Sequence, residues 1–286
     1  HTCSLPISVV PNLYAADPVN KRNFTSIRGI TSSSYDPAVA TYIDGVNQFS
    51  LDTYISPLFD VERIEILRGP QGSLYGRNAM GGVINIITRQ PTNKTDVFAE
   101  LSLGNYGIQR YSAGIKTPVI KDKLFFGAAG LYDANDGFYT NEFNNSKYDK
   151  HHSIVGNYYL KYIANEKLAV TLNAKHNNNR NTGPFPLVFG LDEDFANPYK
   201  LNQNALTKII DNTFNTSLSI NYTGVSFNLQ SQTAYQSNYR YYNKPIDADF
   251  SPIDGVTLIN NYGKNWNKEK GIKQELKRRK AKHATT

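Results

Sequence analysis

Residues 61–92 decide the fold of this chain, and they read Val-Glu-Arg-Ile-Glu-Ile-Leu-Arg-Gly-Pro-Gln-Gly-Ser-Leu-Tyr-Gly-Arg-Asn-Ala-Met-Gly-Gly-Val-Ile-Asn-Ile-Ile-Thr-Arg-Gln-Pro-Thr. Apolar and charged side chains alternate over residues 61–67, which predicts a strand that the Arg-Gly-Pro at 68–70 ends. A second β-rich run covers residues 82–88. The glycines between the two runs permit tight turns and close approach of the backbone. The stretch therefore predicts two strands of a compact domain.

The character of the chain changes after this stretch. Of its 32 asparagines 25 lie beyond residue 93, as do 15 of its 20 tyrosines. From there on, apolar and polar side chains alternate with a period of two, which predicts strands with two different faces. We place a domain limit in residues 90–94, so that residues 1–92 form one domain and residues 93–286 the next. The predicted strands, of which the last has the weakest pattern, cover residues 97–104, 110–116, 123–133, 154–162, 168–175, 214–222, 225–230 and 266–276.

The connections between these strands alternate in length. Short ones at 118–122, 164–166 and 223–224 alternate with long polar ones at 134–150, 177–209 and 239–265. Tight turns at one end of a sheet and long loops at the other are typical of bacterial outer-membrane barrels. The strands of a soluble β-sandwich also alternate apolar and polar side chains, but their outer face is expected to be charged. The polar face here instead carries amide and hydroxyl side chains. The pattern favours a membrane barrel and leaves a soluble sheet as the alternative.

Composition excludes several classes of protein. The longest nearly apolar run falls far short of the ~20 residues that a membrane-spanning helix needs. A single cysteine, Cys3, excludes an internal disulfide and a cysteine-ligated metal site. The net charge of +7 resides in residues 264–286, where nine Lys and Arg accompany two Glu, so we expect a tail or a fragment end and no nucleic-acid partner. Neither a nucleophile motif nor metal-ligand spacing of the five histidines is present, so we expect no enzyme, cofactor or bound metal.

Residues 61–92 closely resemble the end of the plug domain of TonB-dependent outer-membrane receptors. Residues 24–30, Phe-Thr-Ser-Ile-Arg-Gly-Ile, and residues 39–46, Val-Ala-Thr-Tyr-Ile-Asp-Gly-Val, are similar to earlier plug strands of the same family. The resemblance covers residues 20–133 by motif and the remainder by its barrel-like pattern. It implies an α+β plug domain, followed by an antiparallel transmembrane β-barrel that encloses the plug.

Size indicates that the chain holds only part of such a barrel. Eight strands enclose a lumen that side chains fill, whereas plugged transporters use about 22 strands. We therefore expect about seven to eight of those strands here, in a curved sheet that does not close. The resemblance also places a signal peptide and a TonB box, the segment that TonB pulls, before residue 1.

The function implied by the resemblance is that of an outer-membrane receptor and transporter in a Gram-negative bacterium. Its cargo would be a scarce nutrient, most often a ferric siderophore, although haem, cobalamin or a saccharide stay open. Its partners would be the TonB energy-coupling complex, the small ligand and outer-membrane lipid. A passive barrel or surface-binding protein with a structural plug is the alternative, and a TonB box in the full gene would separate the two.

Two groups of residues are predicted to carry this function. The plug-motif and plug–barrel contact residues are Arg28, Asp44, Gly45, Glu62, Arg63, Glu65, Arg68, Gly69, Tyr75, Gly76, Gly81 and Gly82. Some of these charges are expected to pair with barrel carboxylates such as Glu100 or Glu275, so that breaking the pairs releases the plug, with ordinary surface charge as the alternative. The aromatic candidates for ligand contact are Tyr35, Phe49, Tyr54 and Phe138.

Overall fold

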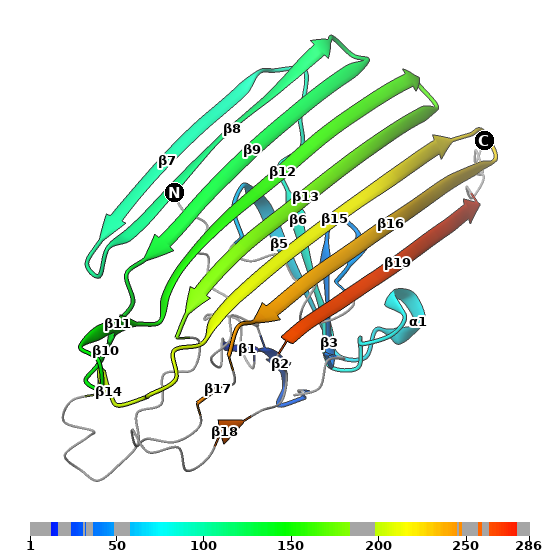
Figure 1. The fold of residues 1–286 in the computed structure, drawn as a ribbon. Coiled ribbons are helices and arrows are strands. Elements are labelled where there is room, and N and C mark those ends of the chain that lie inside the picture. Colours follow the sequence, from blue (N-terminus) through cyan, green and yellow to red (C-terminus); the bar gives the residue numbers. More distant parts are fainter. Residues whose placement is uncertain are drawn as a thin grey trace.

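A computed structural model of the chain shows one long curved sheet with a smaller group of elements beside it (Figure 1). The structure describes residues 13–16, 24–30, 32, 37–48, 58–183, 198–244, 246–247, 257–258 and 263–278. Within these residues no helix has the length and apolar character to cross a membrane.

The large sheet, called the wall below, contains eight antiparallel strands in the order β19-β16-β15-β13-β12-β9-β8-β7. Their bounds are β7 Asp96–Gly104, β8 Ile108–Ile120, β9 Leu124–Asn135, β12 Lys150–Asn165, β13 Leu168–Thr182, β15 Lys208–Thr223, β16 Phe227–Tyr242 and β19 Gly263–Arg278. Strands β7 and β19 form the two edges, so the wall is an unclosed curved sheet, as the sequence predicts.

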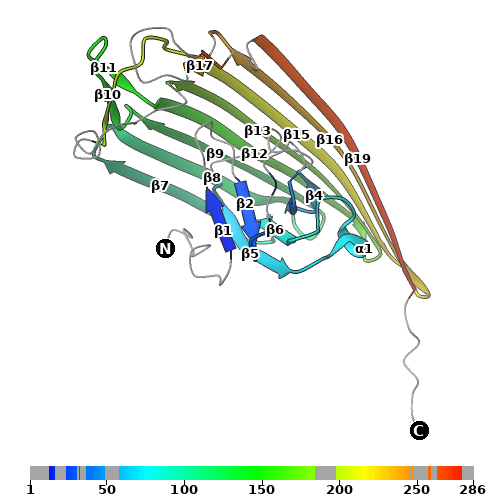
Figure 2. The ribbon, with the colours of Figure 1, turned by 90° about the horizontal axis from the view of Figure 1, so that it is seen from below.

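The smaller group, called the plug below, lies on the concave side of the wall (Figure 2). Its four-stranded sheet has the order β4-β3-β6-β5, with β3 parallel to β6 and β5 antiparallel to β6. A separate hairpin pairs β1 with β2. The bounds are β1 Leu13–Ala16, β2 Phe24–Ile27, β3 Val39–Ile43, β4 Val46–Asn47, β5 Val61–Arg68, α1 Gly72–Tyr75 and β6 Gly82–Thr88. An α+β plug followed by barrel strands is the predicted fold, and the structure has it.

The long connections gather at one end of the wall and the short turns at the other (Figure 1). Two small sheets lie in the long connections. One joins β10 Tyr139–Asn141 to β11 Ser146–Tyr148 and β14 Lys200–Leu201, and the other pairs β17 Ile246–Asp247 with β18 Thr257–Leu258.

Several wall strands are longer than predicted. Strand β13 runs to Thr182, although residues 177–182 are assigned to a loop above because asparagine is depleted in strands. Each residue there pairs with both β12 and β15, and Asn177 and Asn179 are buried while Asn178 between them is exposed. The alternation of buried and exposed residues continues through the asparagines that follow the last apolar residue of the strand. A pattern of hydrophobicity alone therefore does not show where this strand ends.

The two faces of the wall differ in chemistry. Large apolar side chains on the convex face are exposed, among them Leu101, Leu103, Phe126, Ile154, Leu160, Leu172, Phe214 and Leu218. The concave face buries amides and hydroxyls, among them Asn157, Asn173, Asn215, Ser217, Gln232 and Gln236. Apolar side chains outward and polar side chains toward the lumen are the arrangement of a membrane barrel.

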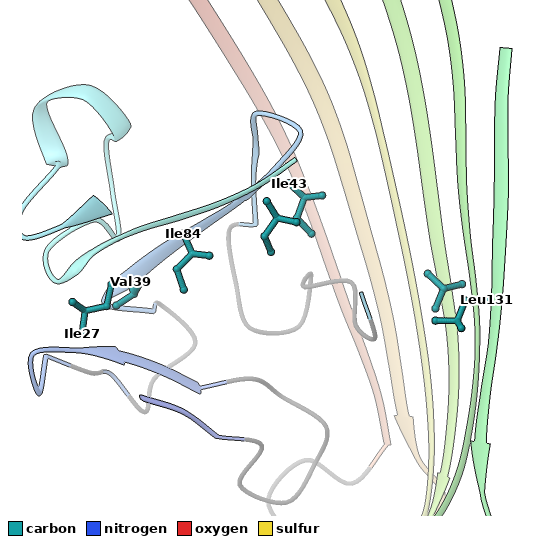
Figure 3. Close-up of a cluster of buried hydrophobic side chains, with 7 residues drawn as sticks. Ile27, Val39, Ile43, Ile84 and Leu131 are labelled. Atoms are coloured by element: carbon teal, nitrogen blue, oxygen red, sulfur yellow. The ribbon is translucent and has the colours of Figure 1, made fainter. Parts of the chain in front are cut away.

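The apolar core sits mainly within the plug (Figure 3). Ile27, Val39 and Ile84 are at most 5% exposed and pack together in it. Leu131 and Val155 extend the same cluster onto β9 and β12 of the wall. Apolar packing thus contributes to holding the plug against the wall, and polar contacts supply the rest.

Candidate functional site

The hairpin that joins β3 to β4 carries the plug to the wall. Its two-residue turn is Asp44-Gly45, and both residues have positive φ, 50° and 79°. Turns with two positive φ angles match the twist of a hairpin and favour Asp-Gly, which explains the sequence locally. A Cβ at position 45 would lie 2.7 Å from Gln232 Oε1 of β16, so any larger residue there would have to displace the Gln232 side chain.

Asp44 is the most connected carboxylate of this contact. Its Oδ2 accepts hydrogen bonds from Lys175 Nζ at 2.6 Å, Tyr159 OH at 2.5 Å and Thr88 Oγ1 at 2.8 Å, and its Oδ1 accepts from the Thr88 amide at 2.8 Å. The Asp44 and Lys175 side chains are each only 7% exposed. Lys175 Nζ also lies 5.1 Å from the centre of the Tyr159 ring. Removing one member of such a buried ion pair typically costs about 3–5 kcal/mol, because the other charge stays buried and unpaired.

Amide side chains of the wall hold the rest of the hairpin. Gln232 Nε2 donates to the Asp44 carbonyl at 2.9 Å, and Gln236 Nε2 donates to the Asn47 carbonyl at 2.8 Å. Asn215 Nδ2 donates to Gln48 Oε1 at 3.0 Å. These donors come from β15 and β16, whereas Lys175 comes from β13 and Tyr159 from β12, so the hairpin tip bridges four wall strands.

A second polar attachment lies at residues 58–60. Lys116 Nζ of β8 contacts Asp60 Oδ1 at 2.6 Å, and their side chains are 3% and 1% exposed. Nearby, Arg110 Nη2 donates to the Leu58 carbonyl at 2.9 Å while its Nη1 pairs with Asp133 at 2.7 Å. The plug is therefore fixed at two sites, by one carboxylate at each.

At the second attachment, the Asp60 carboxylate has fewer hydrogen-bond donors among the described residues than the Asp44 carboxylate has at the first. Burial raises the pKa of the Asp60 carboxyl, although Lys116 acts in the opposite direction. Within the described part of the chain Asp60 Oδ2 is buried without a hydrogen-bond partner. A buried carboxylate with one unsatisfied oxygen is more easily neutralised than one with several donors.

A small pocket of about 20 Å³ separates the two attachments. Its lining includes Ile43 and Phe59 of the plug and Val155, Asn157 and Lys175 of the wall. The volume holds about one water molecule, so the site is a contact between two bodies and not a ligand cavity. Within the residues the structure describes, no three His, Cys, Asp or Glu side chains are grouped to hold a metal ion.

Of the predicted contact residues, Asp44 and Gly45 lie at the wall. Glu62, Arg63 and Glu65 instead lie on the exposed side of β5 and pair with each other, through Arg63 Nη1 to Glu62 at 2.7 Å and Arg63 Nε to Glu65 at 2.7 Å. The hydrogen bond between Arg63 and Glu65 raises the pKa of the Arg63 guanidinium and lowers the pKa of the Glu65 carboxyl. The expected partner Glu100 accepts a hydrogen bond from Ser112 within the wall, at 3.4 Å.

That difference has a structural reason. Strand β5 is the outer strand of the plug sheet, so its charges stay beside one another. Arg28 and Arg68 are exposed in the plug. The side chain of Glu275 lies outside the residues whose side chains are described.

The remaining motif residues shape the plug itself. Tyr75 follows the glycine-rich turn, and its carbonyl accepts a hydrogen bond from Tyr42 OH at 2.6 Å. Gly82 has φ 152°, and a Cβ there would lie 2.4 Å from the Leu67 carbonyl oxygen. Gly69, Gly76 and Gly81 lie in the same connection between β5 and β6.

The aromatic candidates for ligand contact are only partly described. Phe138 lies at the long-loop end, and its ring is 5.2 Å from that of Tyr106. Tyr35, Phe49 and Tyr54 lie outside the described residues. Their role stays a prediction.

Sequence reasoning missed the wall side of the contact. Lys116 and Lys175 occupy the polar face of their predicted strands, and a cation on a face that otherwise carries amides is the signal that could have identified them. Tyr159 and Asp60 gave no such signal, because tyrosines are common throughout the strands and Asp60 lies just before the motif at residues 61–92.

The fold and this contact define part of a barrel-like wall with a plug on its concave side (Figure 2), and comparisons with known proteins show which family this arrangement resembles. Residues 7–83 match the family model described as the TonB-dependent Receptor Plug Domain. The chain is 43% identical over 108 residues to the pesticin receptor of Yersinia pestis, covering 37% of this chain and 16% of the relative. It is 34% identical over 104 residues to the catecholate siderophore receptor Fiu of Escherichia coli K12, covering 35% of this chain and 13% of that receptor.

Solved structures agree with these matches. The ferric yersiniabactin uptake receptor FyuA from Yersinia pestis superimposes with a TM-score of 0.75 and 25% identity, covering 85% of this chain and 39% of that one. The import receptor Fiu from E. coli K12 superimposes with a TM-score of 0.63 at 17% identity over 94% of this chain and 41% of that one, which shows the fold.

Residues 7–83 are thus similar to the plug domain of TonB-dependent receptors, among whose members are receptors named for siderophores, and the chain spans well under half the length of these relatives. That class lies in the outer membrane of Gram-negative bacteria, the location expected from the sequence, and consists of receptors and transporters rather than enzymes. The family match ends at residue 83, so the domain limit near residue 92 stays a prediction.

Proposed function

We propose that the protein is a TonB-dependent transporter that carries a ferric siderophore across the outer membrane. Its relatives are named as siderophore and pesticin receptors. Residues 1–92 form the plug in this proposal, and residues 93–286 form the first strands of the barrel. The TonB complex is the partner that supplies energy in this proposal.

The attachment of the plug is the observation that supports transport best. Two carboxylates, Asp44 and Asp60, anchor the plug to lysines of the wall. A few specific polar contacts can be exchanged for contacts with water or with each other when the plug is pulled, whereas a continuous apolar interface would resist such exchange. The plug is therefore built to leave its position on the wall and to return.

A reversible cross-link between plug and wall tests this proposal. Gln48 and Asn215 touch through their side-chain amides at 3.0 Å, so a short bis-methanethiosulfonate reagent can link Gln48→Cys to Asn215→Cys, in a Cys3→Ser background of the full-length protein, and join the hairpin to β15 through disulfides that reduction breaks. We expect this cross-link to abolish uptake of a radiolabelled ferric siderophore and reduction to restore it. Each single cysteine variant is the matched control and should transport under both conditions.

Two results would count against the proposal. Full uptake through the cross-linked double variant would mean that the hairpin does not leave the wall. A deletion strain that grows as well as its parent on every single iron and cobalamin source would favour the passive barrel with a structural plug.

A further inference from the structure

The convex face of the wall has an uneven distribution of charge. In the described strands β7, β8, β9, β12, β13, β15 and β16, no Asp or Glu occupies an outward-facing position. The outward-facing Lys and Arg of the same strands are Lys150, Arg180 and Lys208. All three lie at the long-loop end of the wall: Lys150 and Lys208 begin β12 and β15, and Arg180 lies two residues before the end of β13.

Strand register brings these cations together. Lys150 pairs with Thr182, which pairs with Lys208, so two lysines flank one threonine in a single cross-strand row. In the next row His152 stands directly opposite Arg180. Directly opposite side chains on adjacent strands lie about 4.5–5.5 Å apart at Cβ, so the four residues form one patch, called the basic patch below.

The cations of the patch are only partly neutralised. Lys150 pairs with Asp136 of the adjoining loop at 3.0 Å, and both side chains are more than half exposed. Arg180 Nη1 donates to Asn212 Oδ1 at 2.7 Å and to the Asn179 carbonyl at 2.8 Å. Both are neutral acceptors, so within the described part of the chain the charge of Arg180 has no carboxylate beside it.

Aromatic side chains flank the basic patch at the level just below it. The outward-facing row Tyr111, Tyr132, Ile154, Asn178, Asn212, Tyr239 crosses six strands. Rings of Tyr111 and Tyr132 stack with centres 6.0 Å apart. Tyrosines at this position mark the boundary between the apolar band and the lipid headgroups. The basic patch therefore lies at headgroup height, outside the apolar band.

From this placement we propose that the basic patch binds the phosphate headgroup of an anionic phospholipid. A phosphate takes charge-assisted hydrogen bonds from Arg and Lys, and the asparagines beside Arg180 add neutral donors. The absence of outward carboxylates on these strands removes the groups that would repel such a lipid. The proposal needs the outer-membrane location and does not depend on which nutrient is transported.

Lipid binding to the full-length protein in neutral detergent micelles tests the proposal. Native mass spectrometry would compare phosphatidylglycerol, phosphatidylcholine and inorganic phosphate as added probes. We expect the unaltered protein to retain phosphatidylglycerol in preference to phosphatidylcholine and not to retain inorganic phosphate. Arg180→Gln with Lys208→Gln should weaken binding of phosphatidylglycerol roughly fivefold for each cation removed.

The matched control is Lys147→Gln with Lys200→Gln. These lysines lie in β11 and β14 at the same end of the molecule but outside the wall, and the control removes the same charge. The proposal fails if the Arg180 and Lys208 variant keeps its preference, if the control loses as much, or if free phosphate binds as well as the lipid. Siderophore uptake is measured on the same proteins, so a failure of transport in the unaltered protein is distinguished from a failure of lipid binding.

Discussion

The two attachments of the plug use the same pair of residue types in different surroundings. Asp44 accepts hydrogen bonds from Lys175, Tyr159 and Thr88, so both of its oxygens have donors. Asp60 has Lys116 at one oxygen, while its other oxygen has no partner in the described part of the chain. Each hydrogen bond to a buried carboxylate stabilises its contact, and burial raises the pKa of the Asp60 carboxyl. We infer that the Asp44 attachment is the stronger and that the strength of the Asp60 attachment depends on pH.

The largest expected effect comes from breaking the Asp44 attachment. Lys175→Met keeps the length of the side chain but leaves Asp44 buried without its cation, and we expect the hairpin to lose about 3–5 kcal/mol of local stability. Hydrogen exchange of a peptide covering residues 39–48 in the full-length protein measures this loss, because its amides are protected only while the hairpin is paired. Unchanged exchange would show that the ion pair does not hold the hairpin.

A smaller and pH-dependent effect is expected at the other attachment. Lys116→Met should cost on the order of 2 kcal/mol at neutral pH, less than at Lys175 because the raised pKa of Asp60 lets the buried carboxyl take up a proton. A carboxyl whose folded-state pKa is raised contributes stability that is present at low pH and is lost as the pH rises through that pKa. The defect should therefore shrink as the pH falls from neutrality toward about 4.

The same hydrogen-exchange measurement, on a peptide covering residues 58–68 at several pH values, checks this expectation. The unaltered protein at each pH is the control. A Lys116→Met defect that grows as the pH falls would contradict the assignment of the sensitive attachment to Asp60.

The smallest effect is expected for the charges on β5. Arg63→Gln removes the partner of Glu62 and Glu65, but this cluster is exposed and solvent screens it. We expect no measurable change in exchange of either peptide or in siderophore uptake. If uptake were lost while hydrogen exchange stayed unchanged, Arg63 would have a role in transport that its contacts with Glu62 and Glu65 do not explain.

The sequence determined the faces of the wall and the identity of the plug. Alternation is a local property with a period of two, so residues such as Leu172 and Asn173 show from the chain alone which sides of a strand they occupy. The plug motif likewise depends on consecutive residues, and its resemblance to the family placed Asp44 and Gly45 in the group of motif and contact residues. The predicted ends of the strands were less accurate. Asparagines 177–179 continue strand β13 because they pair with strands β12 and β15, and the local sequence does not show this pairing.

Only the tertiary structure decided which charge meets which. Lys175 is 131 residues from Asp44 along the chain, and Lys116 is 56 residues from Asp60. No local pattern relates such positions, because their distance depends on where packing of the Ile43, Leu131 and Val155 cluster seats the plug against the wall. The Glu62, Arg63 and Glu65 run shows the converse: its composition suggested a contact, but β5 lies at the outer edge of the plug sheet, where neighbouring charges satisfy one another.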